Sequence, residues 1–230
     1  MIPFRNLAET VTPDGSRLTL HEHDGDYFIK LNGRQLMSST STSSELLLAE
    51  RGCSHLAHYP SPRVLIGGLG LGFTLERVLD SVGRNAVVHV AELVPQVVTW
   101  NREFLKEVNG GLLDDPRVEV KVADVFALLR AASGGEGYDA ILLDVDNGPT
   151  SFVQPKNSRI YNRRGLAVIR SALRPGGRVA FWSAEAEPLF AHSLQRAGFD
   201  TESIPAKANE HAKRFAHMIY VGIRGDGAPR

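Results

Sequence analysis

The sequence has one cysteine, no long apolar run and no excess of charge of either sign. Because the lone Cys53 cannot form a disulfide within the chain, it is typical of a protein from a reducing compartment. No apolar segment reaches the ~18 residues that a membrane-spanning helix needs. The first residues also lack the charged and apolar regions of a signal peptide. We therefore expect a cytoplasmic protein with no membrane partner.

The charged residues are balanced, with 26 lysines and arginines against 26 aspartates and glutamates. Proteins that bind nucleic acids in general carry a basic excess or a basic stripe, so we expect no nucleic-acid partner. Histidine, cysteine and acidic residues are not clustered with the spacing of metal ligands, and we expect no metal site. At 230 residues the chain is long enough for one α/β domain with a small addition.

The first part of the chain, residues 1–60, is predicted to form a small β region followed by a linking helix. Residues 17–23 and 27–31 have the composition of two strands, with a turn at Asp24-Gly25-Asp26 between them. A stretch rich in serine and threonine then precedes a helix expected over residues 45–58. Because a hairpin of this size is not stable alone, we expect it to pack on the core domain or on a second subunit.

The remainder, residues 61–230, alternates short apolar strands with amphipathic helices. The expected strands lie at residues 64–66, 86–92, 118–122, 138–144, 179–182, 200–204 and 217–223. The alternation indicates a parallel sheet with right-handed crossovers, and the last two strands an antiparallel pair at one edge. The sequence thus predicts an α/β fold with a Rossmann-like, doubly wound, mostly parallel seven-stranded sheet. Ligands of such sheets bind at the carboxyl ends of the strands.

A turn with three glycines, Gly68, Gly70 and Gly72, follows the first of these strands. Glycine allows positive φ and lets the backbone approach a ligand closely. The dinucleotide-binding fingerprint needs glycines at its first, third and sixth positions, and neither register of this turn meets that requirement. The observed G-x-G-x-G pattern suits a nucleoside without a pyrophosphate and argues against an NAD-dependent oxidoreductase.

Acidic residues end the next three strands of the domain. Glu92 is placed to accept hydrogen bonds from ribose hydroxyls. Asp124 is placed to accept an adenine amino proton while Val125 packs on the ring, or to cap the following helix. Asp144 and Asp146 end the fourth strand, where paired acids can bind a metal, hold a cation or take a proton from an amine nucleophile.

Together these residues resemble the spermidine synthase family of aminopropyltransferases, which use decarboxylated S-adenosylmethionine on a class I methyltransferase-like fold. The segment around Glu45 and Glu50 is similar to the family's acid-containing helix before the core domain. The resemblance implies that Glu92 binds the ribose and Asp124 the adenine. It also implies that Asp144 is the base, or orients the amine, and that Asp146 is a second substrate acid. A homodimer is implied as well.

Two departures from the family pattern remove expected ammonium contacts. Leu71 stands where the family's glycine loop carries an aspartate that helps hold the donor's amine tail, and Leu48-Ala49 stands where a Tyr-His pair helps hold the polyamine. These departures favour methyl transfer from S-adenosylmethionine to a small molecule, an amine, as the acceptor. Aminopropyl transfer from decarboxylated S-adenosylmethionine is the alternative, and a non-catalytic nucleoside-binding module is a third hypothesis.

Overall fold

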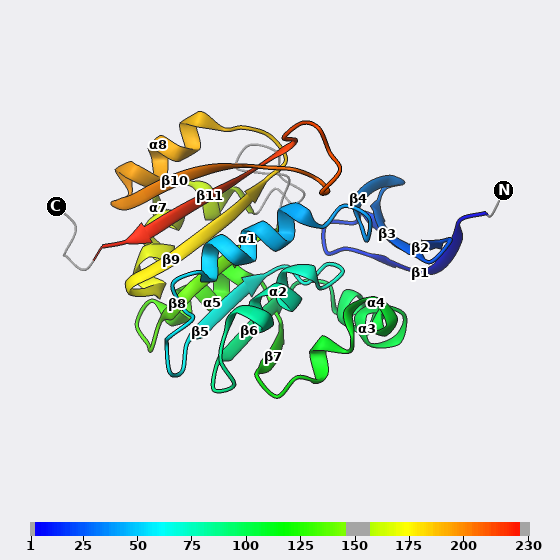
Figure 1. The fold of residues 1–230 in the computed structure, drawn as a ribbon, viewed down its shortest axis with the longest axis horizontal. Coiled ribbons are helices and arrows are strands. Elements are labelled where there is room, and N and C mark those ends of the chain that lie inside the picture. The colour runs from blue at the N-terminus through cyan, green and yellow to red at the C-terminus, as the bar shows by residue number, and fades with distance from the viewer. Residues whose placement is uncertain (1–2, 146–156, 226–230) are drawn as a thin grey trace.

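The computed structural model describes residues 3–145 and 157–225, which form two sheets and the helices that cover them (Figure 1). The smaller sheet lies at one end of the molecule and has four antiparallel strands in the order β1-β2-β3-β4. Its strands are β1 (Arg5–Val11), β2 (Arg17–His23), β3 (Asp26–Leu31) and β4 (Arg34–Ser38). Leu18, Leu20 and Ile29 are buried and join the core of the larger unit. The sheet therefore packs on the core domain through one apolar face.

The sequence predicts only the middle hairpin of this sheet, β2 and β3, and misses both outer strands. Strand β1 alternates weakly and is largely exposed, while β4 has only five residues. Neither has a run of β-branched or aromatic residues that would mark it as a strand. Their pairing partner determines their structure, because β1 pairs with β2 and β4 with β3.

Helix α1 (Ser43–Cys53) connects the two sheets and packs against helix α2 and strand β9 of the larger unit. Its buried face includes Leu48, Ala49 and Cys53. Burial raises the pKa of the Cys53 thiol to about 12, so this cysteine is a packed, protonated group at neutral pH. The helix ends earlier than residue 58, where the sequence predicts its end, and residue 60 lies in the connection to β5. The division of the chain at residue 60 stays a prediction.

The larger sheet has seven strands in the order β10-β11-β9-β8-β5-β6-β7, which confirms the predicted fold class. Its strands are β5 (Arg63–Gly67), β6 (Val87–Glu92), β7 (Val118–Val122), β8 (Tyr138–Leu143), β9 (Leu173–Ser183), β10 (Phe199–Ala206) and β11 (His217–Arg224). The first five of these pair in parallel. The pairs β11–β9 and β10–β11 are antiparallel and form one edge, as the sequence predicts.

Helices cover both faces of this sheet. They are α2 (Phe73–Ser81), α3 (Pro95–Glu103), α4 (Lys106–Asn109), the 3-10 helix η1 (Leu112–Asp114), α5 (Val125–Ala132), α6 (Ser158–Tyr161), α7 (Arg163–Ala172) and α8 (Pro188–Arg196). Alternate residues of each strand face opposite sides, so Val64 and Ile66 pack in one apolar cluster and Leu65 in the other. In the described ranges no helix is both long and apolar enough to cross a membrane.

Two local expectations differ from the structure. The helix expected over residues 161–173 begins at Arg163 as α7 and is preceded by the short helix α6, because Asn162 leaves the helical conformation and caps α7 by accepting a hydrogen bond from the Gly165 amide at 3.0 Å. The turn expected at residues 174–177 lies inside β9. Leu173 pairs with Tyr138 and Arg178 with Ala140, so the intervening residues bulge from the strand.

Candidate active site

A cavity of about 820 Å³, including its open mouth, lies at the carboxyl ends of the parallel strands. Its floor is formed by the residues that follow β5, β6, β7 and β8, which is where the sequence pattern places a ligand. Its volume falls in the range of small-molecule sites. The structure therefore brings Gly68 and Gly70 of the glycine turn together with Glu92, Asp124 and Asp144 around a single space.

The glycine turn depends on the absence of side chains at two of its positions. Gly68 has φ of +91°, and a Cβ added there would lie 2.4 Å from the carbonyl oxygen of Asp144. Gly70 has φ of +53°, and its added Cβ would lie 2.7 Å from Sδ of Met37. Gly72 is the N-cap of α2 with φ of +98°. Gly68 and Gly70 let the backbone line the cavity directly.

Glu92 ends β6 and is buried against the glycine turn. Its carboxylate accepts hydrogen bonds from the backbone amides of Leu69 at 3.0 Å and Val94 at 2.8 Å. Burial raises the pKa of Glu92, although the hydrogen bonds from these amides oppose that rise. Because a carboxylate has about four lone-pair sites, Glu92 can hold the turn and still accept ribose hydroxyls.

Asp124 precedes α5 and caps it by accepting a hydrogen bond from the Phe126 amide at 2.9 Å. The capping role that the sequence analysis weighed for this residue is thus observed. The same carboxylate also forms an ion pair with the guanidinium of Arg159 in α6, whose central carbon lies 4.8 Å from the centre of the Phe126 ring. Val125 is buried and lines the cavity beside Asp124.

Asp144 follows β8 and is held against the glycine turn from the other side. Its amide donates a hydrogen bond to the carbonyl of Gly67 at 3.0 Å, and the residue lines the cavity. Asp146, the second acid of the predicted pair, lies outside the described residues. Within the described ranges, no three histidine, cysteine or acidic side chains are grouped as a metal would require.

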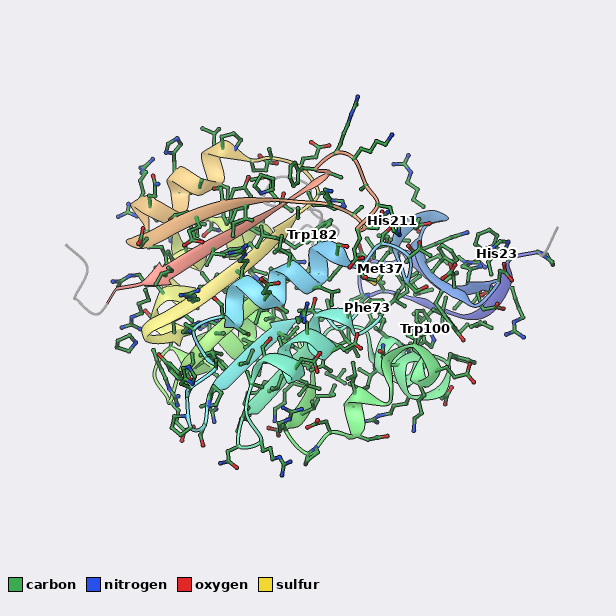
Figure 2. The ribbon with its side chains drawn as sticks, viewed as in Figure 1. His23, Met37, Phe73, Trp100, Trp182 and His211 are labelled. Atoms are coloured by element: carbon green, nitrogen blue, oxygen red, sulfur yellow. The ribbon has the colours of Figure 1, made fainter. Side chains whose placement is uncertain are left out.

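The N-terminal sheet supplies a wall of the cavity that the sequence does not predict. Leu18, Ile29 and Met37 from β2, β3 and β4 face the strand-end acids across it. Figure 2 shows Met37 at the junction between the small sheet and the core domain. Sequence reasoning also misses Arg159, the ion-pair partner of Asp124. The only signal for this wall was that a small β region needs a partner to pack on.

A second, smaller hollow opens beside the first and contains one of the two departures from the family pattern. We call it the acidic hollow; it is lined by Met37, Glu45, Gly68, Leu69, Gly70, Leu71, Gly72, Phe73, Thr74 and Asp144. Leu71 is 2% exposed and forms part of its wall. Leu48 and Ala49 are fully buried in the core and line neither space. Their apolar character therefore serves packing.

Comparison with known proteins identifies relatives in sequence and in structure. Residues 48–196 match the model of the family described as "Spermine/spermidine synthase domain". The chain is 32% identical over 166 residues to polyamine aminopropyltransferase 1 of Hyperthermus butylicus, which covers 71% of this chain and 55% of the relative. It is 37% identical over 115 residues to the polyamine aminopropyltransferase of Mycobacterium tuberculosis, which covers 50% of this chain and 21% of the relative.

Solved structures show the same fold. A crystal structure of spermidine synthase in complex with the transition-state analogue AdoDATO matches with a TM-score of 0.72 at 19% identity, over 97% of this chain and 73% of that chain. This chain spans about half the length of the Hyperthermus relative and about a fifth of the mycobacterial one. The family model nevertheless covers more than half of the chain. The chain belongs to the spermine/spermidine synthase domain family.

Proposed function

We propose that this protein is an enzyme that transfers an aminopropyl group from decarboxylated S-adenosylmethionine to a small amine acceptor. The observation that carries the proposal is the convergence of Glu92, Asp124 and Asp144 on one cavity beside a glycine turn. Membership of the family, and the function stated in the names of its relatives, support aminopropyl transfer over the methyl transfer that the sequence departures favour. Homodimer formation and cytoplasmic location stay predictions.

The donor's nucleoside would occupy the main cavity. Glu92 accepts hydrogen bonds from the ribose hydroxyls, Asp124 accepts one from the adenine amino group, and Val125 packs on the base. The apolar wall from the N-terminal sheet, with Leu18 and Ile29, removes the base and ribose from water. These contacts fix the sulfonium near Asp144, which lines both the cavity and the acidic hollow.

The reaction is then a displacement at the aminopropyl carbon bound to sulfur. The lone pair of the acceptor amine forms the new C–N bond while the C–S bond breaks. The electron pair of the C–S bond returns to sulfur, and 5′-methylthioadenosine leaves. The proton that the attacking nitrogen loses passes to the carboxylate of Asp144 and from there to solvent. Positioning the two reactants contributes most of the rate, and the carboxylate stabilises the cationic charge between them.

Turnover of decarboxylated S-adenosylmethionine with a panel of diamines, measured as release of 5′-methylthioadenosine, tests this function. Asp144→Asn should keep nucleoside binding and lower the rate by about 100-fold or more, the usual contribution of a general base. Asp200→Asn is the matched control, because Asp200 is exposed on strand β10 and lines neither space. Unchanged turnover in Asp144→Asn would remove Asp144 from the mechanism. Nucleoside binding with no turnover in the wild type would indicate a binding module instead.

A further inference from the structure

The acidic hollow adjoins the nucleoside cavity. Four residues line both spaces, namely Met37, Gly68, Gly70 and Asp144. The hollow measures about 320 Å³ with its open mouth, less than half the volume of the main cavity. Because Asp144 and the glycine turn border both spaces, the hollow lies next to the place where a substituent of the nucleoside near Asp144 would project.

The charged side chains that line the hollow, among the residues that the structure describes, are acidic. They are Glu45, from the first turn of α1, and Asp144, and this described lining includes no lysine, arginine or histidine. The remainder of the lining is glycine backbone, Thr74 and apolar groups such as Leu71. An ammonium group is the ligand chemistry that such a wall favours, and a carboxylate is the one that it excludes.

Glu45 is held in place for such a ligand. The hydroxyl of Ser44, itself buried, donates a hydrogen bond to Glu45 Oε2 at 2.6 Å. Burial raises the pKa of Glu45, while the bond from Ser44 lowers it by a smaller amount. No cation in the described part of the chain contributes to this balance. A bound ammonium would supply the missing opposite charge.

We propose that Glu45 binds the terminal ammonium of the donor's aminopropyl group and thereby selects the decarboxylated donor over S-adenosylmethionine. This inference rests on the proposed function and adds to it the residue that binds the donor's amine tail. Glu45 would bind this amine in a chain that has Leu71 where the family's glycine loop carries an aspartate for the same purpose. The α-carboxylate of S-adenosylmethionine would enter the space beside Glu45, and repulsion between the two carboxylates disfavours it.

Calorimetric titration with three ligands separates tail recognition from nucleoside binding. The ligands are decarboxylated S-adenosylmethionine, S-adenosylmethionine and 5′-methylthioadenosine, which lacks the tail. The variant Glu45→Gln keeps the shape of the side chain and removes its charge. Glu50→Gln is the matched control, because Glu50 is an exposed glutamate of the same helix that does not line the hollow.

In the wild type, the decarboxylated donor should bind about 100-fold more tightly than S-adenosylmethionine. Glu45→Gln should weaken binding of the decarboxylated donor by about 10- to 100-fold, as expected for the loss of a charged partner. Its affinity for 5′-methylthioadenosine should stay within about twofold, and Glu50→Gln should bind all three ligands like the wild type. Glu45→Asp, which restores the charge on a shorter side chain, should recover part of the loss.

Four results would overturn the inference. Unchanged binding of the decarboxylated donor by Glu45→Gln would remove Glu45 from the site. An equal loss for 5′-methylthioadenosine would show that Glu45 acts only on the structure of the helix. A wild type that binds 5′-methylthioadenosine with no preference for the decarboxylated donor would reject tail selection while leaving nucleoside binding intact. A wild type that binds none of the three would reject both this inference and the proposed function.

Discussion

The carboxylate of Asp124 is shared between the backbone amide of Phe126, bound to Oδ1 at 2.9 Å, and the guanidinium of Arg159, which pairs with Oδ2. A ligand that donates a proton to Asp124 must share these oxygens with Arg159 or displace it. Since a carboxylate has about four lone-pair sites, both partners and an adenine amino group can be accommodated. Helix capping and ligand recognition are therefore compatible at this residue.

Asp124→Asn should abolish the preference for adenine while keeping the helix cap. The amide oxygen of asparagine still accepts the Phe126 proton, so the thermal midpoint should fall by only a few degrees. The wild type should bind 5′-methylthioadenosine about 10-fold or more tightly than 5′-methylthioinosine, which has no amino group to donate. Calorimetry should find the two ligands nearly equal for the variant. A full preference retained in Asp124→Asn would assign the adenine contact to another group.

Gly68→Ala should be much more harmful than Gly33→Ala, although both glycines have positive φ. Gly33 has φ of +81° with nothing within 4 Å of an added Cβ, whereas the Cβ at Gly68 would meet the Asp144 carbonyl at 2.4 Å. The backbone conformation alone costs about 1–2 kcal/mol. The clash should raise the loss in free energy of unfolding to about 3 kcal/mol or more.

Urea unfolding of both variants measures this difference, and turnover measures its consequence. Gly68→Ala should displace Asp144 and lose activity, and Gly33→Ala should remain active. Equal destabilisation of the two would contradict the close approach of the turn to Asp144.

The strand-end acids could be predicted from the sequence because they follow from local pattern. A short apolar run ends, an acid follows, and a parallel sheet places such ends along one edge. Glu92, Asp124 and Asp144 all lie there. Arg159 could not be predicted, because its partner Asp124 is 35 residues away in the sequence and no helical or strand periodicity links them. The same holds for Met37, whose place beside Gly70 depends on how the small sheet packs.

Glu92→Gln should lose the energy of ribose recognition and loosen the glycine turn. Glutamine directs an NH₂ group toward the amides of Leu69 or Val94, which are themselves donors, or leaves one of them unbonded. The unsatisfied group should lower the free energy of unfolding by about 1–3 kcal/mol. Removing the ribose hydroxyls of the ligand should weaken binding to the wild type by about 10-fold and to the variant hardly at all, because both changes remove the same contact. Additive losses would place the ribose elsewhere.

Binding of the decarboxylated donor should depend on pH through Glu45. Burial raises the pKa of this carboxyl above its ordinary 4.5, and the titratable side chains among the described residues that line the hollow are Glu45 and Asp144. The donor's amine stays protonated below about pH 10, as a lysine does. Glu45 must lose its proton to pair with it, so affinity should rise with pH, by up to tenfold per unit, below the raised pKa of Glu45 in the free protein and should level off above it.

Calorimetry from pH 5 to pH 8 checks this slope, and the two reference titrations identify its source. 5′-Methylthioadenosine carries no amine tail, so its affinity should not follow Glu45. The decarboxylated donor should lose the Glu45 part of its slope in Glu45→Gln, while Glu50→Gln should retain it. An affinity that falls as pH rises would contradict binding of an ammonium by this carboxylate, because ionisation of Glu45 would then oppose the ligand.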